Sequence, residues 1–156
     1  MLTSSEKKDY ILRLIEQMRR LVEALLGKVR DGDDAERDLA GARETLGLLL
    51  GPLAGIVPRM DSVTAGQMVS DPDVLHAWAE LTAAEAEVAA ARGDATSAGA
   101  SRRRALELAL EAHLRTPTDR PDLLALVARL RPSVDARTLV PRHADALDAI
   151  ADPPEA

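Results

Sequence analysis

Three histidines are the side chains in this sequence best suited to metal binding or to acid–base chemistry near neutral pH. They are His76, His113 and His143, and no two of them have the i, i+4 spacing of a helical metal site. The sequence contains no His-Glu-x-x-His motif, no Gly-x-Ser-x-Gly motif and no cysteine. We therefore predict no catalytic residue, no metal and no cofactor, and we expect that the protein is not an enzyme.

Glu85 is an acidic residue that falls beside a buried face of an expected helix over residues 72–92. A second helix is expected over 96–115, and a turn near residues 94–95 would make the two antiparallel. Residue 85 then comes to lie opposite Arg104, so we predict a partly buried, structural Glu85–Arg104 ion pair. The alternative is a glutamate at the edge of the core with its carboxylate in water, because charged residues are rarely buried unless paired.

Polar residues follow one face of the first expected helix and are suited to recognising a partner protein. They are Asp9, Arg13, Glu16, Gln17 and Arg20. Residues four apart on this face, such as Asp9 and Arg13, also allow ion pairs within the helix. The alternative interpretation is therefore a solvent-exposed face that these pairs stabilise.

Arg102 and Arg103 belong to the only dense basic cluster, which covers residues 102–104. Successive residues of a helix point about 100° apart, so the three arginines cannot form a single patch. Arg102 or Arg103 could still join a neighbouring basic residue and contact an acidic partner. The alternative is a solvated face.

Helices must position these residues, because the composition strongly favours helix. The chain has 28 alanines and 24 leucines among 156 residues and no phenylalanine, and residues that favour strands are scarce. Start and stop signals divide the sequence into helices over 4–27, 34–50, 72–92 and 96–115, with Gly27 ending the first. Short connections make these helices two antiparallel hairpins.

We expect an all-α bundle in one domain over residues 1–151, with a frayed tail over 152–156. One or two short helices follow the second hairpin, over about 123–130 and 142–151. The apolar residues of the first helix recur at core spacing, and a dimer seam is the alternative use of that stripe. Tyr10 and Trp78 are each expected to anchor one end of a hairpin's core.

The net charge of −6 argues against a dedicated nucleic-acid-binding protein. The longest apolar run, residues 46–57, is interrupted by glycine and proline and is shorter than the ~20 residues that a spanning helix needs. No apolar segment typical of a secretory signal follows the charged residues at the start. We therefore expect a cytoplasmic protein.

The stretch from Ala77 to Leu108 resembles a tetratricopeptide helix pair. Residues 77–81, Ala-Trp-x-x-Leu, are similar to the start of such a repeat. The Gly-Asp pair at 93–94 and the segment 98–108 are similar to its turn and second helix. The sequence departs from the repeat in its spacing, because Trp78 and Gly93 are 15 residues apart where the repeat has about 11, and no second copy is visible.

Over residues 8–114 the sequence also resembles an uncharacterised bacterial family of small all-helical proteins. The resemblance rests on residues 9–17, Asp-Tyr-Ile-Leu-Arg-Leu-Ile-Glu-Gln, and on residues 104–108, Arg-Ala-Leu-Glu-Leu. It implies the helical fold and carries over no activity.

The function that these observations favour is a non-enzymatic protein-interaction or adaptor module. Its partner would be another protein or a second copy of the chain, since helical hairpins commonly present grooves to a helix or peptide. The alternative is a peripheral membrane protein that contacts lipid through the first helix and the apolar segment 46–57.

Overall fold

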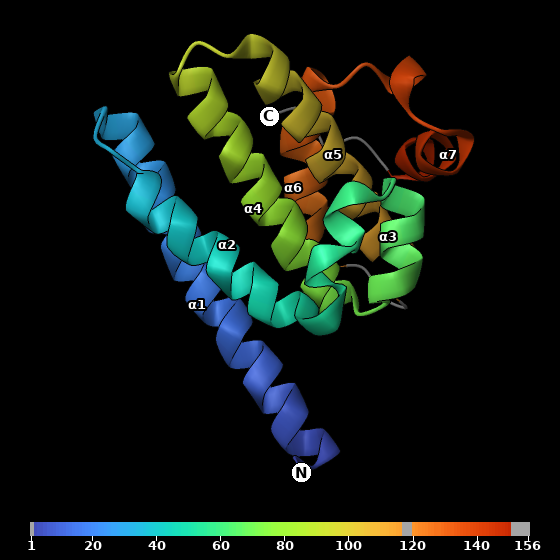
Figure 1. The fold of residues 1–156 in the computed structure, drawn as a ribbon. Helices are drawn as coiled ribbons and strands as arrows, with labels where there is room; N and C mark the ends of the chain where they lie inside the picture. The colour runs from blue at the N-terminus through green and yellow to red at the C-terminus, as the bar shows by residue number, and fades with distance from the viewer. Residues whose placement is uncertain (1, 117–119, 151–156) are drawn as a thin grey trace.

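The computed structural model describes residues 2–116 and 120–150 of the chain. Within these residues the chain forms seven α-helices and four short 3-10 helices, with no β-strand, which confirms the expected all-α bundle (Figure 1). The predicted tail, 152–156, lies outside the described residues. The α-helices are α1 (Ser4–Asp31), α2 (Glu36–Leu50), α3 (Ser62–Val69), α4 (Pro72–Ala91), α5 (Ala95–Leu114), α6 (Pro121–Leu130) and α7 (Pro141–Ala149).

Helices α1 and α2 form the first hairpin. α1 does not end at Gly27 as predicted but continues to Asp31, where Gly32 adopts a left-handed conformation (φ 75°). Val29, which follows Gly27, still packs against the core. Its burial outweighs the roughly 1 kcal/mol that a glycine costs inside a helix.

The N-terminal part of α1 projects beyond the rest of the molecule (Figure 1). α2 has 15 residues against the 28 of α1 and cannot cover all of it. Tyr10 lies in the projecting part and is 41% exposed, so the expectation that it anchors the core is wrong. The buried residues of α1 begin at Leu14.

Helices α4 and α5 form the second hairpin, and α4 is the central helix of the bundle. α4 packs against α5 on one side and against α1 and α2 on the other (Figure 1). Trp78 of α4 is 5% exposed and belongs to the larger hydrophobic cluster, as expected. Small residues such as Ala98 and Ala105 of α5 are fully buried and let the two helices approach closely.

The predicted Glu85–Arg104 ion pair does not form. Glu85 Oε2 accepts hydrogen bonds from Arg43 of α2, from Nε at 2.9 Å and from Nη2 at 2.6 Å. Arg104 instead donates to Ser62 Oγ at 2.8 Å, and its guanidinium lies 5.1 Å from the centre of the Trp78 ring. The hairpin register determines only how far along their helices the two residues lie. Glu85 lies on the side of α4 that faces α2, and Arg104 lies on the side of α5 that faces α3.

The three short helices complete the bundle around α5, because α3, α6 and α7 all pack against it. Side chains of α6 and α7, among them Leu123, Leu126 and Leu147, are buried in the larger hydrophobic cluster. Among the described residues, no helix is long and apolar enough to cross a membrane.

Candidate functional site

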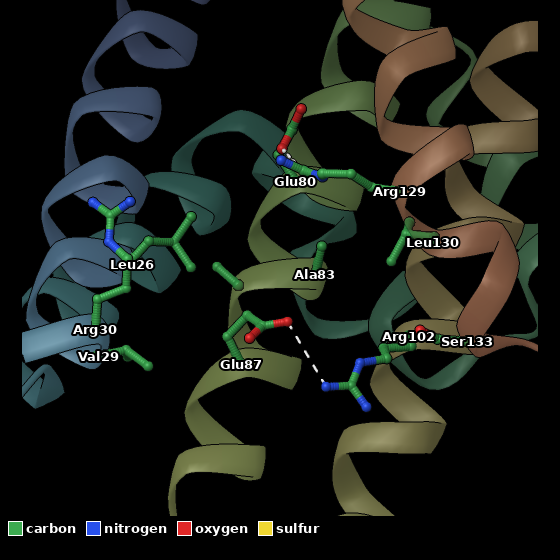
Figure 2. A pocket seen from close by; sticks show the side chains of 11 residues that line it. Leu26, Val29, Arg30, Glu80, Ala83, Glu87, Arg102, Arg129, Leu130 and Ser133 are labelled. Carbon is green, nitrogen blue, oxygen red and sulfur yellow. Dashed lines mark hydrogen bonds and ion pairs between the residues drawn. The ribbon is translucent and has the colours of Figure 1, made fainter. Parts of the chain in front are cut away.

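Two hollows open side by side between α1, α4 and α6, with volumes of about 540 and 380 Å³. They share Leu26 of α1, Glu80 of α4 and Arg129 of α6, so they adjoin one another, and together they are called the groove below. Figure 2 shows the 380 Å³ hollow, with α1 on one side, α4 behind and α6 on the other side. The two helical walls and the helical floor give the groove the form of a trough.

The three helices that build the groove run in the same direction. In the larger hollow the lining residues fall between Ile15 and Leu26 on α1, between His76 and Glu80 on α4 and between Asp122 and Arg129 on α6. The smaller hollow is lined by residues later in each of these helices, for instance Val29, Glu87 and Leu130. The amino ends of the helices therefore point to the larger hollow and their carboxyl ends to the smaller one.

The floor of the groove is formed by α4, which contributes three alanines, Ala77, Ala83 and Ala84, together with His76, Glu80 and Glu87. Leu26 of α1 and Leu126 of α6 line the walls. Alanines on a helix surface let another helix approach closely, since interaxial distances of about 8–10 Å depend on the side chains at the contact. A groove with apolar residues between charged ones fits an amphipathic helix.

Charged residues form the rims of the groove. On the rim of α1 these are Glu16, Arg19, Arg20, Glu23 and Arg30. Across the groove, Arg129 Nη2 lies 3.4 Å from Glu80 Oε2, and Arg102 Nη2 lies 3.8 Å from Glu87 Oε1 (Figure 2). The groove thus carries both signs of charge around its apolar residues.

A histidine–glutamate pair lies at the larger hollow. The His76 side chain is 7% exposed, and its Nε2 atom is 3.3 Å from Glu80 Oε1. Within the described residues this Nε2 atom has no hydrogen-bond partner of good geometry. Burial alone would raise the pKa of Glu80, but the interactions with His76 and Arg129 outweigh it and lower that pKa below its ordinary value.

A second polar cluster is buried between α3, α5 and α7 and centres on Glu111, whose side chain is fully buried. Glu111 Oε1 accepts a hydrogen bond from Arg115 Nη1 at 2.6 Å, and Oε2 accepts one from Arg142 Nε at 2.9 Å. His143 Nε2 is 2.7 Å from the same Oε2 atom. Burial acts to raise the pKa of Glu111, but the hydrogen bonds from Arg142, His143 and Arg115 prevail and lower it.

The Glu111 cluster is enclosed, since His143 is 1% exposed and its Nδ1 atom is buried without a hydrogen-bond partner among the described residues. None of the hollows described here is lined by Glu111 or His143. The four side chains join α7 to α5 through charge-assisted hydrogen bonds, which are shorter and stronger than neutral ones. The arrangement is suited to holding α7 in place.

Gly66 of α3 lies directly against the Glu111 side chain. A Cβ atom at position 66 would be 2.6 Å from Glu111 Oε1 and 3.1 Å from Glu111 Cβ. Both distances are shorter than van der Waals contact, and the hydrogen bonds of the carboxylate prevent it from moving away. Close approach of α3 to α5 therefore requires glycine here.

We expect Gly66→Ala to lower the free energy of unfolding by about 1–3 kcal/mol, because overpacking a filled core forces the backbone or a side chain to shift. Urea denaturation followed by circular dichroism measures the loss. Gly47→Ala of α2 is the matched control, since a Cβ atom there meets nothing within 4 Å. It should leave stability unchanged or raise it slightly. Equal effects of the two substitutions would contradict this account of Gly66.

The structure divides the residues predicted to bind a partner among several surfaces. Glu16, Arg20 and Arg102 line the groove. Asp9 and Arg13 border a shallow depression further along α1, which Glu16 also lines. Two others face elsewhere: Gln17 Nε2 donates to Thr45 Oγ1 of α2 at 3.4 Å, and Arg103 lines a separate hollow near the start of α5.

Glu80 and Arg129 of the groove were not predicted from the sequence, and His76 was considered only as a metal ligand or acid–base residue. Glu111 was also not predicted, although a signal was present. Glu111 follows the buried Leu108 by three residues, which places it near the apolar stripes of its helix. On α1, Glu23 and Arg30 continue the polar face past Arg20, so that wall could have been extended from spacing alone.

In the part of the chain that the structure describes, no group of three or more histidine, cysteine or acidic residues could hold a metal ion. No protein-family model matches the chain, and no match was found among the curated proteins or the solved structures. The function is therefore inferred from the helices and side chains themselves.

Proposed function

We propose that this protein is a non-enzymatic protein-interaction module of the adaptor type. It binds an amphipathic helix of a partner protein in the groove between α1, α4 and α6. The observation that carries the proposal is a groove between two helical walls in which alanines and leucines lie between charged side chains. From Ile15 to Arg30 the α1 wall is about 22 Å long at 1.5 Å per residue, which accommodates roughly four turns of a bound helix.

The resemblance of the second hairpin to a tetratricopeptide pair supports the same proposal, because such repeats use concave helical surfaces for binding. The proposed relation to the bacterial family of small helical proteins is compatible with it and adds no activity. We also propose a cytoplasmic location, because the charged residues at the start of the sequence are not followed by an apolar segment typical of a secretory signal.

Lipid contact through residues 46–57 is less well supported, because most apolar side chains of this segment face inward. Leu50 and Val57 are buried, and Leu49 packs against the core. Among the large apolar side chains, Leu48 and Ile56 are the exposed ones. Binding of the protein to anionic vesicles in a sedimentation assay would reinstate this alternative.

Site-specific photo-crosslinking in cells of the native host tests the proposal. A photoreactive residue at position 30, on the rim of the groove, should give one discrete crosslinked protein. The same residue at position 37, which is exposed on α2 and lines neither hollow, should not. Ala83→Trp fills the floor of the groove and should abolish the product at position 30.

Three results would contradict the proposal. They are equal crosslinking at positions 30 and 37, a product that persists in Ala83→Trp, and no product at position 30. A product of twice the chain's mass would identify the partner as a second copy of the protein.

A further inference from the structure

We infer that the helix bound in the groove runs antiparallel to α1, α4 and α6, with acidic residues in its first turn and basic residues in its last. The acidic turn meets Arg30 and Arg102, and the basic turn meets Glu16 and Asp122. This inference rests on the proposed function and adds the direction and the charge pattern of the partner. It is argued from the common direction of the three helices and from the charges at the two ends of the groove.

The direction follows from the backbone dipoles of the groove. Each helix carries partial positive charge at its amino end and partial negative charge at its carboxyl end. Because α1, α4 and α6 run the same way, their dipoles add, and the smaller hollow lies toward their negative ends. The dipole of a bound helix interacts favourably with the dipoles of all three helices only when its positive amino end lies at that hollow.

Side-chain charges at the smaller hollow favour an acidic partner there. Arg30 is exposed and has no ion pair among the described residues. Arg102 faces Glu87 at 3.8 Å, which is beyond hydrogen-bonding distance, so its guanidinium keeps donors for a ligand. The charged residues that line only this hollow are Arg30, Arg102 and Glu87, so their net side-chain charge is positive.

Side-chain charges at the larger hollow have the opposite balance. Three acidic residues, Glu16, Glu23 and Asp122, face two arginines, Arg19 and Arg20. Glu16 and Asp122 are exposed and have no ion pair within the described residues. A basic last turn on the bound helix complements them and also suits the dipole of that helix itself.

The residues in the middle of the groove do not select a direction. Glu80 and Arg129 belong to both hollows and face each other, with His76 beside Glu80. Their charges are largely neutralised within the protein. The preference therefore depends on the two ends, which the length of the groove separates by more than a Debye length at physiological salt, about 8 Å.

Two hydrocarbon-stapled helical peptides of 18 residues test the inference. They share one composition and one face of alanine and leucine. One carries three glutamates in its first two turns and three arginines in its last two, and the other has these charges exchanged. Affinity for the full-length protein is measured by fluorescence anisotropy at low salt. The peptide with exchanged charges can make the same ion pairs only by running parallel to the three helices, against their dipoles. We therefore expect the acidic-first peptide to bind about threefold more tightly.

Direction is read separately from affinity. A nitroxide label at the amino end of the acidic-first peptide should broaden the NMR methyl signals of Val29 and leave those of Ile15 sharp. Broadening of Ile15 instead, or equal affinity of the two peptides, would overturn the inference and leave the proposed function standing. Failure of both peptides to bind would count against the proposed function itself.

A charge exchange within the groove provides the matched variant. Arg30→Glu combined with Glu16→Arg inverts the charges at the two ends, and both positions are exposed. This variant should prefer the peptide with the exchanged charges. Arg37→Glu combined with Glu44→Arg makes the same change on exposed positions of α2 and should keep the original preference. An unaltered preference in the groove variant would overturn the inference.

Discussion

Replacing Glu111 with alanine is expected to lower the free energy of unfolding by about 3 kcal/mol, the lower end of the range for breaking a buried ion pair. The substitution removes the carboxylate that accepts from Arg115 and His143, and Arg115 keeps only the longer hydrogen bond to the carbonyl oxygen of residue 111, at 3.3 Å. We expect a loss at the lower end of this range because the side chain of Arg142, the third partner, is 46% exposed and can be hydrated when the carboxylate is removed. Urea denaturation followed by circular dichroism measures the change.

Two further variants identify the origin of this loss. Glu111→Gln keeps an acceptor but removes the charge, so its loss of stability should be smaller than that of the alanine variant. Glu87→Ala removes an exposed glutamate of α4 and should change stability by no more than about 0.5 kcal/mol. The structural role assigned to Glu111 is wrong if Glu111→Ala behaves like Glu87→Ala.

The contribution of Glu111 should also depend on pH. The pKa of Glu111 is lower in the folded protein than its ordinary value of 4.5. A lowered folded-state pKa gives stability that is present above the unfolded-state pKa and is lost as the pH falls through the folded-state value. The stability difference between the wild type and Glu111→Gln should therefore be constant near neutral pH and shrink below about pH 4.5. A difference that grows on acidification would contradict this.

Replacing Trp78 with alanine is expected to destabilise the protein by about 3–5 kcal/mol, as for other large-to-small changes in a core. Trp78 is 5% exposed and is packed in the larger hydrophobic cluster. The substitution also removes the ring on which the Arg104 guanidinium lies. Because Trp78 is the only tryptophan, circular dichroism rather than fluorescence should follow the unfolding.

Tyr10→Ala is the matched control for Trp78→Ala. It removes the only other aromatic side chain, which lies on the projecting part of α1 and is 41% exposed. Its effect should stay within about 0.5 kcal/mol. A loss at Tyr10 comparable to that at Trp78 would mean that the projecting segment of α1 is packed in solution.

Local signals in the sequence were sufficient to predict most helices. Asp71 and Pro72 begin α4 as a cap and a first-turn proline, and Gly51 follows the last residue of α2. Such signals act through neighbouring residues, so they can be read without the fold. The predicted end of α1 at Gly27 was wrong because packing of Val29 beyond it, a tertiary effect, outweighs the local cost of glycine.

The composition is sufficient to predict an all-helical protein, because alanine and leucine favour helix through their own conformational preferences. Which charged side chains meet depends instead on contacts between helices that are distant in the sequence. Glu85 pairs with Arg43 and Glu111 with Arg142, which are 42 and 31 residues away along the chain. The groove likewise needs α1, α4 and α6, which local sequence cannot bring together. Helical spacing defines the faces of one helix, whereas the neighbour of each face depends on how the helices pack.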